Sequence, residues 1–116
     1  MVNEVHYIWL KKGAEVWNQW RITSRDIIPD LIEADLIEAD LIGVDFTGAD
    51  LAKADFTEAF LLAANLTKAN LTKANLTEAY LNQVDLNHAN LTEADFTSAN
   101  LREADFTSAN LTRCRR

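Results

Sequence analysis

A large apolar side chain returns at every fifth position over most of this chain. All 17 positions taken in steps of five from Leu31 to Leu111 hold Leu or Phe. Two residues before each of them the sequence places Ala, with Pro29, Val44 and Val84 as the variants. Asp or Asn usually lies between the two, and Thr usually follows. The strictness of this period constrains the fold more than any other feature of the sequence.

Neither a helix nor a flat strand can bury such a set of side chains. Five residues rotate an α-helix by about 140° beyond one full turn, which would spread the leucines around its axis. In a strand, an odd period sends successive leucines to opposite faces. A chain that turns a corner every five residues, with four corners to a coil, instead places every Leu or Phe and every small Ala inside. Asp, Asn and Thr suit such corners because their side chains hydrogen-bond to nearby backbone.

The segments ADLIEADLIGVDFTGADLAKADF and ADFTSANLREADFTSANL closely match an A-[D/N]-L-x-x motif, and the chain resembles the pentapeptide repeat family over about residues 29–114. This resemblance implies an all-β solenoid, a right-handed quadrilateral β-helix in which the Leu or Phe and the residue two before it are buried. The repeats correspond to about four coils and a stack of ~20 Å at the usual spacing between strands. The family often carries a capping helix, in agreement with the N-terminal pattern described next.

The sequence predicts three parts: an N-terminal α-helical cap with a linker over residues 1–28, the repeat over residues 29–114, and a short tail at 115–116. A helical wheel predicts one amphipathic helix over roughly residues 3–21. Its apolar face consists of Val5, Trp9, Gly13, Val16 and Trp20, flanked by Leu10 and Trp17, and its polar face of Lys11, Glu15, Asn18 and Gln19. Gly13 in the apolar face predicts a close approach to another element. Such a helix would cover the apolar end of the first coil.

Residues 20 apart are expected to lie above one another, so the sequence can be laid out as a map of the surface. Phe60 and Tyr80 stand where the repeat has Asp or Asn, and they fall on one face. Ile42 and Leu62 replace Thr on the same face. These four residues form a candidate partner-binding patch. Two structural explanations stay open, namely a stabilising aromatic ladder and a face that the N-terminal segment covers.

The first and last coils have different expected neighbours. Three isoleucines of the first coil point outward and are expected to contact the N-terminal helix: Ile32, Ile37 and Ile42. After Leu111 only a short tail follows, so the last coil around Phe96, Leu101 and Phe106 is expected to be open. An open coil favours pairing with a second copy, which predicts a homodimer through the C-terminal coil.

Negative charge is concentrated in the first half of the repeat. Residues 30–58 carry nine Asp and Glu and one Lys, a net charge of −8, whereas residues 59–116 carry six charges of each sign. One face is predicted to hold an acidic stripe that consists of Asp35, Glu38, Asp55, Glu58, Glu78 and Asp95. A solvated face whose Asp residues serve the turns explains this stripe. The resemblance offers an alternative, because some pentapeptide repeat proteins resemble duplex DNA, bind DNA gyrase and protect it from quinolones.

No arrangement of residues points to catalysis. The three glycines form no phosphate-binding loop, and His6 and His88 have no second metal ligand at a recognised spacing. No serine is accompanied by a base and an orienting group. Cys114 falls at an Ala-type position of the repeat and is expected in the core. The sequence therefore predicts a protein that is not an enzyme and binds no cofactor or metal.

The composition of the chain limits the kinds of partner and compartment that are expected. The net charge of −7 disfavours direct binding to nucleic acid. A single cysteine fits a reducing compartment. The sequence shows neither a signal peptide nor an apolar run of ~20 residues, so a cytoplasmic protein without a membrane segment is expected. Together these features favour a non-catalytic protein-interaction or scaffold module with an unknown protein partner.

Overall fold

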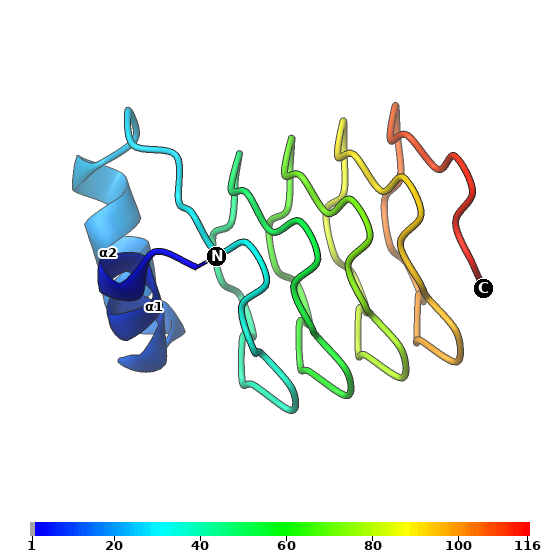
Figure 1. Cartoon of the computed structure of the whole chain (residues 1–116), viewed down its shortest axis with the longest axis horizontal. Helices are drawn as coiled ribbons and strands as arrows, with labels where there is room; N and C mark the ends of the chain where they lie inside the picture. Colours follow the sequence, from blue (N-terminus) through cyan, green and yellow to red (C-terminus); the bar gives the residue numbers. More distant parts are fainter. Residues whose placement is uncertain (1) are drawn as a thin grey trace.

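Two helices lie at one end of a stack of square coils (Figure 1). The computed structural model describes residues 2–116, in which α1 spans Glu4–Lys11 and α2 spans Ala14–Thr23. Met1, the first residue of the predicted N-terminal segment, lies outside the described residues. From Asp30 onward the chain winds away from the helices, one coil after another, and its C-terminus lies at the far end of the stack.

The walls of the coils are held by isolated parallel bridges between residues 20 apart, from Asp30 with Asp50 to Asp95 with Arg115. Each bridge has two hydrogen bonds that run in opposite directions, and the corner residue Glu33 adds a third to the next coil through its N–H, which donates to Ala52 O at 2.9 Å. Leu31 N donates to Asp50 O at 2.8 Å, and Asp50 N donates to Pro29 O at 2.8 Å. Within residues 2–116 no bridge extends into a longer strand. The walls are therefore shorter than the strands expected of an all-β fold, because the chain turns before a second residue can pair.

Each corner is a tight turn that contains one residue with positive φ. At the first corner Ala34 N donates to Leu31 O at 3.0 Å, and Glu33 has a φ of 62°. Positive φ returns every five residues up to Arg113, and glycine occupies only two of these positions, Gly43 and Gly48. A positive φ at the third residue is what a type II turn requires. Fifteen corners therefore hold an ordinary side chain in a backbone region that favours glycine.

The Asp or Asn before each Leu or Phe holds the corner in place. Asp45 Oδ1 accepts hydrogen bonds from Thr47 N at 3.0 Å and from Thr47 Oγ1 at 2.7 Å. Asn90 makes the same pair of bonds with Thr92, at 3.1 and 2.6 Å. Local bonds of this kind are the reason why the repeat reads Asp or Asn, then Leu, then Thr.

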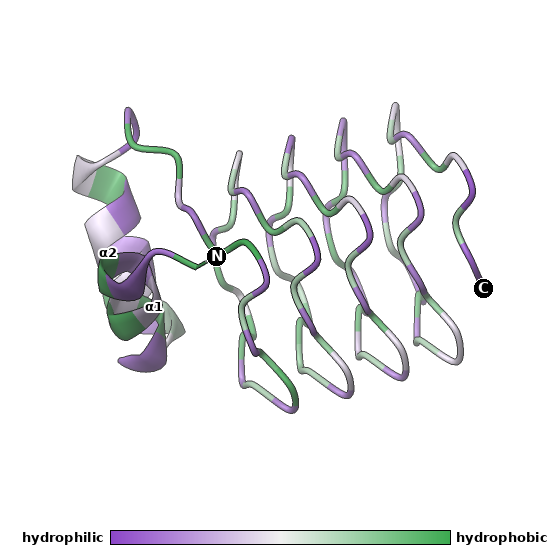
Figure 2. Ribbon diagram, in the orientation of Figure 1, coloured by the Kyte–Doolittle hydropathy of each residue, from purple (hydrophilic) through white to green (hydrophobic). Residues whose placement is uncertain are grey.

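Columns of Leu and Phe, with Ala between them, fill the interior. Figure 2 shows short apolar segments alternating with polar ones along the coils. The Leu and Phe side chains from Leu31 to Phe96 are buried, which confirms the predicted columns. In the last coil Leu101, Phe106 and Leu111 are only partly buried, because no further coil lies against them in the structure. Cys114 is also partly buried, with its thiol donating to Leu91 O at 2.9 Å.

The predicted single helix over residues 3–21 is wrong, because the chain breaks it at Gly13. The φ of Gly13 is 108° and its ψ is 160°, a conformation far from that of a helix. A Cβ atom at Gly13 would meet no atom within 4 Å, so the predicted close approach is also wrong. Gly13 is instead required by its backbone conformation, which is essentially restricted to glycine.

The break also changes which residues face the coils. Trp17 is fully buried and Leu10 is 4% exposed, whereas Val5 and Val16 of the predicted apolar face are 60% and 37% exposed. Asn18, predicted on the polar face, bonds to the first coil. A helical wheel assumes one continuous rotation, and the positive φ of Gly13 resets that rotation between α1 and α2.

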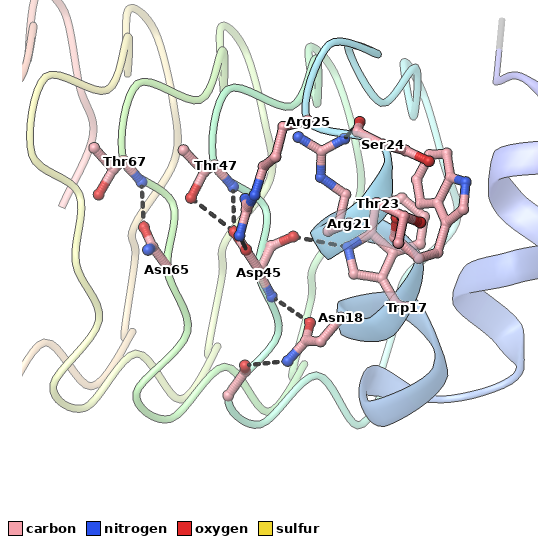
Figure 3. Close-up of polar contacts among 12 residues, drawn as sticks. Trp17, Asn18, Arg21, Thr23, Ser24, Arg25, Asp45, Thr47, Asn65 and Thr67 are labelled. Carbon is pink, nitrogen blue, oxygen red and sulfur yellow. Dashed lines mark hydrogen bonds and ion pairs between the residues drawn. The ribbon is translucent and has the colours of Figure 1, made fainter.

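Asp45 is the main anchor between α2 and the first coil (Figure 3). Trp17 Nε1 donates to Asp45 O at 2.7 Å, and Asn18 Oδ1 accepts from Asp45 N at 2.8 Å. Arg25 forms an ion pair with the Asp45 carboxylate at 2.8 Å. Partial burial pushes the pKa of Asp45 up, but hydrogen bonds from Thr47 and Arg25 outweigh it and lower the pKa. These contacts hold Trp17 edge-on against Phe46, with ring centroids 5.6 Å apart.

Candidate functional site

The two outward aromatics form a parallel stack on one face of the coils. The ring centroids of Phe60 and Tyr80 are 4.9 Å apart and the ring planes differ by 2°. Phe60 is 39% exposed and Tyr80 is 43% exposed. Ile42 and Leu62, the other members of the candidate patch, are 52% and 37% exposed. The N-terminal segment therefore does not cover these four residues, called the apolar patch below.

The aromatic ladder replaces hydrogen bonds that other corners make. Elsewhere the Asp or Asn accepts from the backbone N–H two residues on, but no side chain in the described part of the chain accepts from Leu62 N or Asn82 N. Each such bond contributes about 0.5–1.5 kcal/mol, and one aromatic stack about 0.5–1.5 kcal/mol beyond its area. The stack, together with the apolar area that the two rings bury, offsets the loss of these bonds, so the aromatics keep the corners stable and also leave part of each ring exposed.

A groove lies beside the patch, between the two helices and the first coil. Its volume is about 720 Å³, and its lining includes Tyr7, Gly13, Ile37 and Ile42. Ile37 is 46% exposed and Ile42 is 52% exposed, so the helices leave a large part of both side chains uncovered, although both line the same groove as Tyr7 and Leu10. Only Ile32 of the three isoleucines is half-buried. The helices are bonded to the first coil through Asp35, Gly43 and Asp45, and the groove stays open between these contacts.

The acidic stripe divides into two kinds of carboxylate. Asp35, Asp55 and Asp95 lie in one column, and Asp55 and Asp95 each accept a bond from the Thr hydroxyl two residues on, at 2.5 Å. The hydrogen bonds from Thr97 lower the pKa of Asp95. The glutamates instead occupy exposed corners with positive φ: Glu38, Glu58 and Glu78. The Asp residues thus serve turns, and the column ends at Arg115, which is bridged to Asp95.

Several groups that carry chemistry in other proteins have structural roles here. His6 Nδ1 accepts a hydrogen bond from Asp30 N at 2.9 Å, and burial lowers the pKa of His6. Burial raises the pKa of the Cys114 thiol. Within residues 2–116, no cluster of three or more His, Cys, Asp or Glu is arranged to hold a metal ion. Nor is any helix in that range long and apolar enough to cross a bilayer.

No motif or period in the sequence identified the residues that hold the helices to the coils. Arg21 is buried, and its Nη1 donates to Ser24 O and Ile27 O, both at 2.8 Å. Tyr7 Oη donates to Asp35 O at 2.8 Å. Asn18 and Arg25 bond to Asp45 across 27 and 20 residues of chain. Such contacts follow no period, although the clustering of basic residues near the end of α2 was a weak hint.

The repeat identifies the family. A family model described as "Pentapeptide repeats (8 copies)" matches residues 30–61, 45–83 and 79–115. The chain belongs to the pentapeptide repeat family. Its coils are those of the right-handed quadrilateral β-helix that this family forms, and the match indicates no enzyme family. The matched residues leave α1 and α2 outside, so the helical pair is not accounted for by the family repeat.

Solved structures of this family are similar to the chain. A pentapeptide repeat protein from the thylakoid lumen of Arabidopsis thaliana is 36% identical, with a TM-score of 0.71 over 73% of this chain and 59% of that one. HetL, involved in heterocyst differentiation regulation in the cyanobacterium Nostoc sp. strain PCC 7120, is 38% identical, with a TM-score of 0.67 over 70% of this chain and 38% of HetL. Rfr23 from the cyanobacterium Cyanothece 51142 is 32% identical, with a TM-score of 0.68 over 70% and 56%.

The pentapeptide repeat chain is shorter than these relatives. It spans 59%, 38% and 56% of the three solved chains. No curated protein matches the sequence at a significant level. The comparisons therefore show the family and the fold of the chain. Its own function has to be inferred from the residues that depart from the repeat.

Proposed function

We propose that this protein is a non-catalytic interaction module, in which the stack of coils is a rigid scaffold and the apolar patch binds a partner protein. The observation that carries the proposal is the exposed stack of Phe60 on Tyr80, in a column where every other residue is Asp or Asn. Large aromatic side chains are enriched among the residues that dominate binding energy. Ile42 and Leu62 extend the same surface.

The backbone under the patch is fixed before any partner arrives. Phe60 N donates to Ala39 O at 2.9 Å and Tyr80 N donates to Ala59 O at 2.9 Å. Leu61 N donates to Tyr80 O at 2.8 Å and ties the two coils together. The stacked rings also restrain each other. A surface held in this way loses little conformational entropy on binding, which favours affinity for a given area.

The acidic stripe does not support the alternative of a DNA mimic that binds gyrase. Its carboxylates are interrupted by Asn75 and its column ends in Arg115. Residues 59–116 have no net charge, whereas a mimic of duplex DNA needs regular negative charge along its length. The protein-interaction module is therefore the function proposed here.

A variant that restores the repeat tests this proposal. Phe60→Asp combined with Tyr80→Asn places at both positions the residues that other corners use, so the fold should be retained. Immobilised wild-type protein is expected to retain one or more host proteins, and the double variant to retain at least about tenfold less, since hot-spot residues contribute 2 kcal/mol or more. Asn90→Asp, which adds one negative charge in the equivalent position of another face, is the matched control and should behave as wild type.

The capture experiment requires a check that the double variant is folded and a comparison of the host proteins that each variant recovers. Circular dichroism and thermal unfolding must show that the double variant is folded. If the folded double variant recovers the same host proteins in the same amounts as wild type and Asn90→Asp, the apolar patch is not the binding surface.

A further inference from the structure

The groove beside the apolar patch has one wall from the helices and one from the first coil. Its volume of about 720 Å³ lies within the roughly 300–1,000 Å³ of typical binding pockets. Tyr7, Leu10 and Gly13 lie on the helical side, and Ile37 and Ile42 on the coil side. Because Ile42 belongs to both, the groove and the apolar patch form one continuous apolar surface.

Carboxylates line the rim of this groove. Asp35 Oδ1 accepts from Ile37 N at 3.2 Å, and Asp40 Oδ1 accepts from Ile42 N at 3.3 Å. The second carboxylate oxygen of each has no protein partner within residues 2–116. Both side chains are exposed. Two carboxylates are thus oriented by their turns and keep one oxygen each for a further bond.

The charge of the groove lining is negative, because it holds Asp35 and Asp40 against Lys11. Lys11 is the only cationic residue in the lining, and its ammonium lies 4.6 Å from the centre of the Tyr7 ring. The surrounding segment, residues 30–58, has a net charge of −8. Glu38, between the two lining aspartates in sequence, is exposed as well. Such a field attracts cations and repels anions.

We infer that the groove binds a short cationic and apolar segment of the partner protein. One large apolar side chain of the segment enters between the helical pair and Ile37, and a neighbouring Lys or Arg bonds to Asp35 and Asp40. The inference rests on the proposed function and names the chemistry of that partner. Burial of a Leu, Met or aromatic side chain against the apolar walls is favourable. The free carboxylate oxygens can accept charge-assisted hydrogen bonds from the Lys or Arg. The rest of the segment then runs along the stack over Phe60 and Tyr80.

Three short peptides separate the two parts of this recognition. The whole protein, labelled with ¹⁵N, is titrated with acetylated and amidated Gly-Lys-Leu-Lys-Gly, Gly-Glu-Leu-Glu-Gly and Gly-Lys-Gly-Lys-Gly while amide resonances are followed. The Lys-Leu-Lys peptide is expected to shift the amides of Gly13, Ile37 and Ile42, and to bind at least tenfold more tightly than the other two. Equal binding of the Glu-Leu-Glu peptide would overturn the inference.

A charge-neutral variant tests the role of the two carboxylates. Asp35→Asn with Asp40→Asn keeps the Oδ1 acceptors that the turns need, and Asn is common at this position of the repeat. Loss of two exposed ion pairs is expected to weaken binding of the Lys-Leu-Lys peptide about three- to tenfold. Asp85→Asn with Asp105→Asn removes the same charge on another face and should leave the affinity within about twofold of wild type. Equal effects of the two double variants would contradict the inference.

The outcomes distinguish this inference from the proposed function. If Phe60→Asp/Tyr80→Asn loses the host partner while Asp35→Asn/Asp40→Asn retains it at wild-type level, the patch binds the partner and the cationic inference fails. If both variants retain the partner, the proposed function fails as well. Shifts of Gly13 and Ile42 amides that depend on protein concentration without any peptide would assign the groove to a second copy and also overturn the inference.

Discussion

The two ends of the stack present their apolar cores to very different surroundings. At the first coil Leu31 and Phe46 are fully buried, and Trp17 of the helical pair lies against Phe46 in the same core cluster. At the last coil Leu111, in the same column as Leu31, is only partly buried. The backbone differs in the same way. Leu31 N bonds to the next coil, whereas Leu111 N has no acceptor within residues 2–116. The core side chains of an end coil are therefore fully buried only where another element of the chain covers them.

Removal of the Trp17 side chain should have the largest effect on this comparison. Trp17→Ala leaves a cavity over Phe46 and removes the bond from Nε1 to Asp45 O. We expect the free energy of unfolding in urea to fall by about 3–5 kcal/mol. Ile22→Ala, on the same helix but at a side chain that is 60% exposed, is the control and should cost less than about 0.5 kcal/mol. Similar losses in both variants would show that the helical pair does not complete the first coil.

Matched truncations within one column compare the two ends directly. Leu31→Ala should lower the free energy of unfolding by about 2–5 kcal/mol, because that side chain is fully buried. Leu111→Ala should cost less than half as much, since its side chain is already partly in water. Urea unfolding of the two variants under the same conditions checks the difference. Equal costs would mean that the open coil is as well packed as the covered one.

Two glycines test how the helical region differs from the corners of the coils. Gly13→Ala is expected to cost about 1–3 kcal/mol, purely from backbone strain, because a Cβ there has open space. Gly48 has a φ of 68°, a region that fifteen residues other than glycine also occupy in this chain. Gly48→Ala should therefore cost about 1 kcal/mol, less than Gly13→Ala, because ordinary side chains adopt this region at other corners. A smaller cost at Gly13 than at Gly48 would contradict this view of the break between α1 and α2.

The smallest expected effect is a dependence of stability on pH at the helical end. His6 accepts from Asp30 N, so the fold requires the neutral imidazole, and burial lowers its pKa from the ordinary 6.5. The unfolded chain binds the proton at a higher pH than the folded chain does. Stability should therefore fall as the pH drops below 6.5, and level off once the folded state is protonated too.

The non-titrating variant His6→Asn is the control for this pH effect. Its free energy of unfolding should depend less on pH between 7 and 5 than that of wild type. The carboxyls with lowered pKa, Asp45, Asp95 and Asp105, act in another window, since their contribution is lost only below their ordinary value of 3.8. Identical pH profiles of wild type and His6→Asn would contradict the assignment.

The repeat could be predicted from the sequence because nearly every corner forms the same turn with the same local hydrogen bonds. Leu or Phe, Ala and Asp or Asn each have one place in the turn, and their contacts lie two, three or 20 residues away. The columns, including Phe60 above Tyr80, follow from that period. The exposure of this pair did not follow from it, because it depends on where the helical pair lies.

The helical pair could not be predicted in detail because its contacts follow no period. The helical wheel assumed one rotation through Gly13, although a glycine with a φ of 108° ends it. Asn18 and Arg25 bond to Asp45 through contacts that only the folded chain brings together. The groove lined by Tyr7 and Ile37 results from that arrangement, so the sequence revealed one half of the candidate site and the structure revealed the other.

Photo-crosslinking from the apolar patch tests directly whether this surface binds a partner protein. The photoreactive amino acid p-benzoylphenylalanine is placed at Tyr80, or at Asn90 on another face, and the protein is irradiated in its native host. Tyr80 is 43% exposed and is stacked on a fixed neighbour, so the probe will extend from the patch. If the apolar patch binds a partner protein, position 80 will give a discrete crosslinked partner and position 90 will give none. The same products from both positions, or none from position 80, would contradict binding at the patch.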